Sequence, residues 1–234
     1  MEIISSVNNF ISPMQVSCRN QNLTFGSKPL KKDVFEVKSS SNIDDIIKNL
    51  EDDTVNISEL EEKAPHLYEN VKNGEEEIIR KTKLLNRQTG KYEDAYITAH
   101  KFGFICIHSN DNALGSIILQ QGGNNFLEGK HLTNVSKDYK KNNFLEVVNL
   151  ETRNLGHDAS KYRGIGTELI KQAIIESYKQ NNGGRIALIA DNRFDEGRAA
   201  QSFYEHIGMK HSSDSKLFDA YVFDESDIPN FLKK

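Results

Sequence analysis

The sequence has 234 residues, and its 30 Lys and Arg against 34 Asp and Glu give a formal net charge of -4. This balance excludes binding of polyanions by bulk charge, so nucleic acid is not an expected partner. No apolar stretch reaches membrane-spanning length and the first residues lack a basic-then-apolar signal, so we expect no membrane partner and a cytoplasmic location.

The two cysteines, Cys18 and Cys106, lie far apart in the chain. Neither belongs to a Cys or His pair with the spacing of zinc ligands. We therefore expect free thiols in a reducing compartment and no bound metal.

The N-terminal third divides into two segments. Residues 1–41 are rich in Ser and Asn without a steady apolar period, which predicts a mostly disordered leader. Residues 42–74 are predicted to be helical and to pack on the following domain or lead into it. Ser58 and Glu61 form a possible capping box, and Pro65 ends that helix. Apolar residues at helical spacing in the first helix are Ile43, Ile46, Ile47 and Leu50.

Residues 75–234 are predicted to form the main domain. Its first part, up to Gln121, alternates short β-branched or aromatic runs with turns, which indicates an antiparallel meander. Residues 122–143 are polar and are expected to form a loop with a short helix. The expected strand cores of the meander are Ile78–Leu85, Tyr96–Ala99, Phe102–Ile107 and Ser116–Leu119.

The second part of this domain alternates strands and helices. The expected strands are Phe144–Thr152, Arg185–Ala190 and Leu217–Phe223, and the expected helices are Ile165–Gln180, Arg198–Ile207 and a short tail helix ending near Leu232. The predicted fold class is therefore α+β (mixed α/β), with a largely antiparallel central sheet flanked by helices.

The most informative turn is Lys161-Tyr162-Arg163-Gly164-Ile165-Gly166-Thr167, which opens the long helix. Glycines let a backbone approach a ligand closely, and the first amides of a helix have no internal partners. Together with the helix dipole these amides favour a phosphate or diphosphate. An equally weighted alternative is that Gly164 and Gly166 serve only tight packing.

A second feature follows on the helix after the apolar Arg185–Ala190 strand. Ala200, Tyr204 and Gly208 are spaced by four residues, with Phe203 and Ile207 expected to pack on the sheet. The Tyr204 phenol is placed to protonate a leaving thiolate. The alternative is a tyrosine at the edge of the core, which is the commoner role of a helical tyrosine.

The order of strand, basic-x-x-Gly-x-Gly turn, helix, apolar strand and Ala-x-x-x-Tyr-x-x-x-Gly resembles the GNAT superfamily of acetyl-CoA-dependent N-acetyltransferases. The resemblance covers roughly residues 75–223. It implies that the turn wraps the CoA diphosphate and that the strand before it runs alongside the pantetheine arm. The implied cofactor-binding residues are Leu150, Glu151, Thr152, Lys161, Tyr162, Arg163, Gly164, Ile165, Gly166, Thr167, Asn192 and Tyr204. Asn192 is the candidate replacement for a family Asn whose position holds Gly197 here.

The resemblance also implies catalytic roles for Tyr204 as general acid and Glu146 as general base. Glu146 stands four residues before Leu150, which in a regular strand puts both on one face. Glu151 is the second candidate base, and in a regular strand it points away from Glu146. The alternative for Glu146 is an ion pair with a neighbouring cation.

The expected function is direct transfer of an acetyl group from acetyl-CoA to an amine acceptor, either a small molecule or a protein. The first alternative is a catalytically silent acyl-CoA-binding sensor or scaffold, because a fold does not prove a reaction. A further alternative is a module that binds another phosphate ligand. The pattern identifies neither the acceptor nor an oligomeric state.

Overall fold

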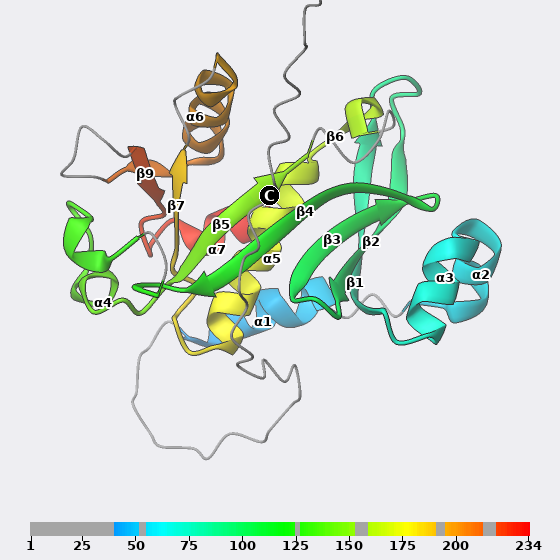
Figure 1. Ribbon diagram of the computed structural model, residues 1–234, viewed down its shortest axis with the longest axis horizontal. Coiled ribbons are helices and arrows are strands. Elements are labelled where there is room, and N and C mark those ends of the chain that lie inside the picture. The colour runs from blue at the N-terminus through cyan, green and yellow to red at the C-terminus, as the bar shows by residue number, and fades with distance from the viewer. Residues whose placement is uncertain (1–39, 52–54, 125–126, 153–158, 191–194, 213–218) are drawn as a thin grey trace, which may run out of the picture. The chain divides into compact units, whose positions relative to one another are not determined.

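The computed structural model describes residues 40–51, 55–124, 127–152, 159–190, 195–212 and 219–234. In this part of the chain nine strands form one sheet, in the order β6-β1-β2-β3-β4-β5-β7-β9-β8 (Figure 1). Neighbouring strands are antiparallel except β5 and β7, which are parallel. The strands are β1 Glu76–Asn86, β2 Tyr92–His100, β3 Phe104–Ser109, β4 Asn112–Gln121, β5 Leu145–Glu151, β6 Tyr162–Arg163, β7 Ile186–Ala190, β8 Lys210–His211 and β9 Asp219–Val222.

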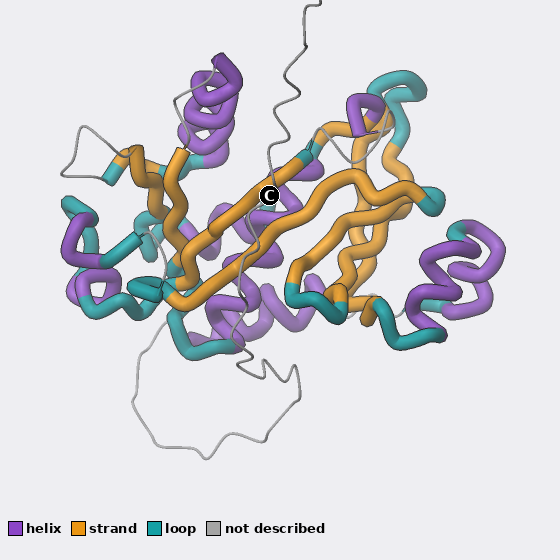
Figure 2. The backbone as a smooth tube through the Cα atoms, viewed as in Figure 1, coloured by secondary structure: helices purple, strands orange, loops and turns teal. Residues whose placement is uncertain are grey.

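Helices come before, between and after the strands along the chain and lie against the sheet (Figure 2). They are α1 Ser40–Glu51, α2 Ile57–Lys63, α3 Pro65–Lys72, α4 Lys137–Lys140, α5 Ile165–Lys179, α6 Asp195–Ile207 and α7 Ile228–Leu232, with 3-10 turns η1 Gly129–His131 and η2 Ala159–Lys161. The predicted mixed α+β architecture with a mostly antiparallel sheet is confirmed. Residues 1–39 of the expected leader lie outside the described residues. The expected boundary at residue 41 is wrong, because α1 already begins at Ser40. None of the described helices is long and apolar enough to cross a bilayer.

The N-terminal helices begin where local capping allows. The side chain of Asn56 accepts a hydrogen bond from the amide of Ser58 at 3.0 Å, so Asn56, rather than Ser58, caps α2. Pro65 occupies the first turn of α3, where its missing amide costs nothing. Asp111, in the β3–β4 turn, accepts from the amides of His66 and Leu67 and ties the start of α3 to the sheet.

One face of the sheet, here called the α5 face, carries the main core. Ile117 of β4 and Val147 of β5 point to this face and pack in one cluster with Leu169 of α5. The apolar face of α6 joins the same cluster through Phe203 and Ile207, as the sequence predicts. Residues of α1 and α7 also belong to it, because these helices contact each other and α7 contacts α5.

The other side of the sheet, here called the opposite face, has two separate covers. Over β1 and β2, Leu60 and Leu67 of α2 and α3 bury Tyr96. Over β7 and β9, Tyr139 of α4 belongs to a second cluster with Ala187. The strands between these two covers therefore keep part of their opposite face accessible.

A buried polar cluster lies under α3. Thr98 donates to Oε2 of Glu76 at 2.5 Å, Asn70 donates to Oε1 at 3.1 Å, and Nε2 of His108 lies 2.9 Å from Oε2. Burial raises the pKa of Glu76, but the hydrogen bond and charge of His108 and the bonds from Thr98 and Asn70 outweigh it. The net effect lowers this pKa from 4.5 to about 2.

We expect Glu76→Gln to lower the free energy of unfolding at pH 7 by about 1–3 kcal/mol, because the buried partners lose a charged acceptor. A depressed carboxyl pKa stabilises the fold above its unfolded value, and this stabilisation is lost as pH falls from 4.5 towards 2. Urea unfolding of both proteins should therefore show a stability difference that narrows over this range. A difference that stays constant with pH would contradict the assignment.

Candidate functional site

The turn before α5 is held against the edge of the sheet by its main chain. The amide of Arg87 donates to the carbonyl of Lys161 at 2.7 Å, and Tyr162 and Arg163 pair with the end of β1 as β6. Gly164 follows with φ of 100°, in the left-handed region that a residue without Cβ adopts most readily. The helix α5 then begins at Ile165, as the sequence predicts.

The first amides of α5 have no partner among the residues that the structure describes. No side chain caps this helix, and its first internal bond runs from the amide of Glu168 to the carbonyl of Gly164 at 2.9 Å. Among the described residues, the amides of Ile165, Gly166 and Thr167 therefore have no hydrogen-bond partner, as is usual for the first turn of a helix. Three such donors at the positive end of a 15-residue helix suit an anion.

Close packing places this turn between α6 and the end of β5. A Cβ on Gly166 would lie 2.9 Å from the ring of Phe203 on α6. A Cβ on Gly115 of β4 would lie 2.8 Å from both the side chain of Ile165 and the carbonyl oxygen of Glu151. Gly166 therefore does serve tight packing against α6, and the same packing brings the first amides of α5 close to the strand end.

The basic and aromatic side chains of the turn differ in orientation. Lys161 is half-buried and Arg163 is exposed, so Arg163 adds positive charge on the solvent side. Tyr162 is buried and its phenol donates to Oε2 of Glu93 at 2.8 Å, with Ser109 3.4 Å away. The Tyr162 side chain thus anchors the turn to β2, and only its main chain is left for a cofactor.

The parallel strands β5 and β7 diverge after a short paired region. Leu145–Val147 pairs with Ile186–Leu188, and beyond these residues the two strands separate, as the arrows in Figure 1 show. The main chain of residues 149–151 still pairs with β4 on its other side. On the side towards β7 it faces no described strand, which leaves main-chain groups open to an extended ligand.

A β-bulge at Val148 coincides with this divergence. Val147 pairs with Leu119 of β4 whereas Asn149 pairs with the preceding residue, Ile118, so β5 carries one extra residue. An extra residue reverses the alternation of side chains beyond it. Leu150 accordingly packs against the core on the α5 face, together with Val147.

Two expectations about strand faces are therefore wrong. Glu146 and Leu150 were expected on the same face of the sheet. The bulge at Val148 instead puts Leu150 on the α5 face and Glu146 on the opposite face. Glu146 and Glu151 were expected to point apart, but both point to the opposite face. Their partners on β4, Gln120 and Ser116, are four residues apart, so both side chains lie on the same face as that of Ile118 between them.

The two carboxylates differ in their surroundings. Glu146 is buried under the loop after β4, and its Oε2 accepts from the amide of Leu127 at 3.3 Å. Glu151 is half-buried at the open end of β5 and makes no hydrogen bond or ion pair with any described residue. Thr152, half-buried, follows it at the strand end. A substrate can therefore reach Glu151 more readily than Glu146.

Tyr204 lies on α6, next to Phe203, whose ring packs on Gly166 at the start of α5. The Tyr204 ring is buried and packs 5.5 Å from the ring of Tyr221 and 5.4 Å from that of Phe203. Burial raises the pKa of Tyr204 to about 12. Because of this raised pKa the phenol is neutral at pH 7 and has a proton to donate. Its hydroxyl makes no hydrogen bond within the described part of the chain. Asn192 lies outside the described residues.

Sequence reasoning missed a buried charged network that positions the start of α5. Nη2 of Arg80 on β1 lies 3.0 Å from Oε2 of Glu168, and Nζ of Lys171 lies 2.8 Å from Oε1. Arg80 also donates to Gln172, and Thr82 donates to Glu168. Burial raises the pKa of Glu168, but the charges of Arg80 and Lys171 outweigh it and lower this pKa, so the network is ionised.

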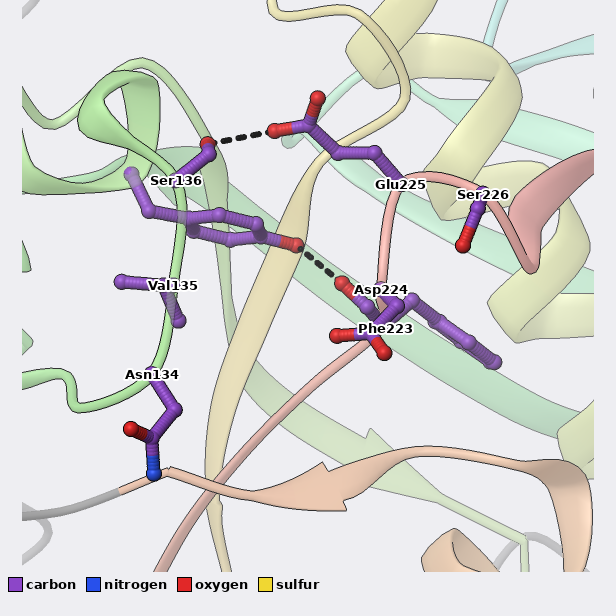
Figure 3. A pocket seen from close by; sticks show the side chains of 8 residues that line it. Asn134, Val135, Ser136, Phe223, Asp224, Glu225 and Ser226 are labelled. Carbon is purple, nitrogen blue, oxygen red and sulfur yellow. Dashed lines mark hydrogen bonds between the residues drawn. The ribbon is translucent and has the colours of Figure 1, made fainter.

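A separate hollow opens between the α4 segment and the chain after β9, away from these residues (Figure 3). Its polar groups are largely engaged with one another. Ser136 donates to Glu225 at 2.5 Å, and the phenol of Tyr139 donates to the carbonyl of Phe223 at 3.2 Å. Arg185 lies 3.5 Å from Glu225. This hollow contains none of the predicted site residues.

No known protein family model matches this chain, and no curated protein matches it in sequence. Among the described residues, no three His, Cys, Asp or Glu side chains gather closely enough to hold a metal ion. The site is therefore defined by its own geometry: the first amides of α5, which have no partner in the described part of the chain, a diverging strand pair, Glu151 and Tyr204.

Proposed function

We propose that this chain is an N-acetyltransferase that moves an acetyl group from acetyl-CoA directly to an amine, as the GNAT resemblance implies. The observation that supports this most is the meeting of three amides at the start of α5, which have no partner among the described residues, with the diverging ends of β5 and β7. The amides suit the diphosphate of CoA, and the open strand edge suits the amide-containing pantetheine arm.

The two faces of the sheet would then hold the two substrates. The diphosphate lies at the α5 face, where the amides of Ile165, Gly166 and Thr167 start the helix. β5 and β7 pair only over Leu145–Val147, and Glu151, which lies beyond this paired region, points to the opposite face. An amine bound on that face would meet the acetyl group without competing for the space of the cofactor.

The reaction requires a base and an acid. An amine with a pKa of about 10.4 is protonated at neutral pH and must lose a proton before attack. Glu151 takes that proton, the nitrogen forms a bond to the acetyl carbon, and the carbon–sulfur bond breaks. Tyr204 gives its proton to the leaving sulfur and regains one from the acylated nitrogen. This scheme assigns the base to Glu151 in place of Glu146.

We expect Glu151→Gln to lower kcat/KM at pH 7 about 100-fold, because the ammonium loses its proton acceptor. The loss should shrink as the pH approaches the pKa of the amine, about 10, where the substrate is deprotonated by solvent. The matched variant Glu146→Gln should keep the wild-type pH profile. Equal pH profiles for wild type and Glu151→Gln would remove Glu151 from the mechanism.

The proposal as a whole is tested with purified full-length chain. CoA and acetyl-CoA binding is measured calorimetrically, and CoA release is followed with a mixed panel of primary amines. Binding with amine-dependent release supports the transferase. Binding without release would instead identify a silent acyl-CoA-binding module. Failure of the folded protein to bind CoA at millimolar concentration would overturn both.

A further inference from the structure

Part of the opposite face stays accessible between its two covers. Under α2 and α3, Tyr96 and Thr98 are almost fully buried, and near the α4 segment Glu146 and Ala187 are as well. Cys106, which pairs with Thr98 and Ser116 between these regions, is also buried. Five other residues between the two covers are half-buried or exposed. They are Phe104, Ser116, Ile118, Asn149 and Glu151, here called the acceptor patch.

Strand register arranges this patch in two neighbouring rows. Ser116 pairs with Glu151, which makes a polar row at the open end of β5. Ile118 pairs with Phe104 on one side and Asn149 on the other, which makes a mainly apolar row two residues further along β4. A single carboxylate therefore stands beside an apolar surface.

The apolar row ends in stacked rings. The His100 ring lies on Phe104 with centroids 4.3 Å apart and planes 10° apart. This stack stiffens the Phe104 ring and leaves a flat, half-buried platform next to Ile118. Flat apolar bodies bind such platforms through dispersion and through burial of apolar area.

The spacing of the rows sets the size of a fitting ligand. With strands about 4.8 Å apart and residues about 3.3 Å apart along a strand, the Cα of Glu151 lies about 8 Å from that of Ile118 and about 12 Å from that of Phe104. A cation beside Glu151 would thus be joined to a ring over Ile118 and Phe104 by a linker of only two or three bonds.

We propose that the acceptor is a primary amine joined by a short linker to a flat aromatic body, an arylalkylamine. The ammonium lies at Glu151 and the ring lies on Ile118 and Phe104. This inference rests on the proposed acetyl transfer and adds the class of its acceptor. A polyamine fits less well, because Glu151 is the only charged member of the acceptor patch.

The experiment uses the full chain with saturating acetyl-CoA and follows CoA release by mass spectrometry. The acceptors are phenethylamine, tryptamine, butylamine, spermidine and a lysine-containing peptide. We expect kcat/KM for the two arylalkylamines to exceed that for each other amine by roughly tenfold or more. A higher value for spermidine or the peptide would overturn the acceptor class while the acetyltransferase function stands. Absence of CoA binding would instead defeat the proposed function.

Two variants locate the ring. Phe104→Ala should raise the KM for phenethylamine roughly tenfold and leave the affinity for acetyl-CoA unchanged. Tyr92→Ala is the matched control, because Tyr92 is an exposed aromatic residue at the start of β2, outside the acceptor patch. An equal KM for both variants would overturn the placement of the acceptor on the patch.

Discussion

Replacement of Thr167 by Glu should weaken CoA binding about 100-fold or more, without loss of stability. Thr167 is the third residue of α5, and a carboxylate there would compete for the free amides and repel the diphosphate. A like-charge contact near a protein surface costs up to about 4 kcal/mol at 4 Å. The same carboxylate interacts favourably with the helix dipole, by about 0.3–1 kcal/mol.

The matched control is Thr167→Gln, which has nearly the same size without the charge. Titration calorimetry should give it a CoA affinity within about threefold of wild type, since an uncharged side chain adds no like-charge repulsion. Thermal unfolding checks that both variants are folded. If Thr167→Glu binds CoA as tightly as wild type, the diphosphate does not lie at the start of α5.

Tyr204→Phe should lower kcat about 100-fold and leave the affinity for acetyl-CoA unchanged, because only the proton donor is removed. Burial raises the pKa of this phenol to about 12. The wild-type phenol therefore stays protonated between pH 6 and about 10, and the deficit should be constant over this range.

A suitable control for Tyr204→Phe is Tyr178→Phe. Tyr178 lies in the last turn of α5, far along the helix from the candidate site at its start. Burial raises the pKa of Tyr178 to about 12 as well, so the two substitutions remove similar phenols from different places. In steady-state kinetics Tyr178→Phe should keep the wild-type kcat, so the kcat values of the two variants should differ by about 100-fold. Unchanged turnover of Tyr204→Phe would leave Tyr204 as a core-edge tyrosine.

The order of helices and long strands was predictable because apolar spacing and glycines mark it. Gly208, with φ of 100°, ends α6 where the sequence predicts. The short strands β6 and β8 were not predicted, since two residues such as Lys210-His211 carry no periodicity and pair only because β9 lies beside them.

The turn before α5 was predictable because Gly164 and Gly166 mark a sharp change of chain direction at the start of a helix. The direction of the side chains on the neighbouring strand β5 was not predictable. Nothing in Leu145–Glu151 marks the bulge at Val148, which arises from pairing with β4. Counting residues by twos along this strand therefore assigned Glu146 and Leu150 to one face.

The sequence also did not predict which charged side chains are buried. Arg80 and Glu76 have polar side chains that a strand pattern assigns to solvent, yet both are buried. Their partners, Glu168 and His108, lie far along the chain and become neighbours only in the folded sheet.

The ionised network around Glu168 has an electrostatic consequence for the helix above it. A carboxylate one turn inside an anion-binding helix would normally lower its attraction for a negatively charged ligand. Arg80 and Lys171 neutralise Glu168 from within the protein, so the positive end of the dipole faces outward undiminished. Loss of both cations would leave the charge of Glu168 uncompensated near the ligand, and affinity would then become more sensitive to ionic strength.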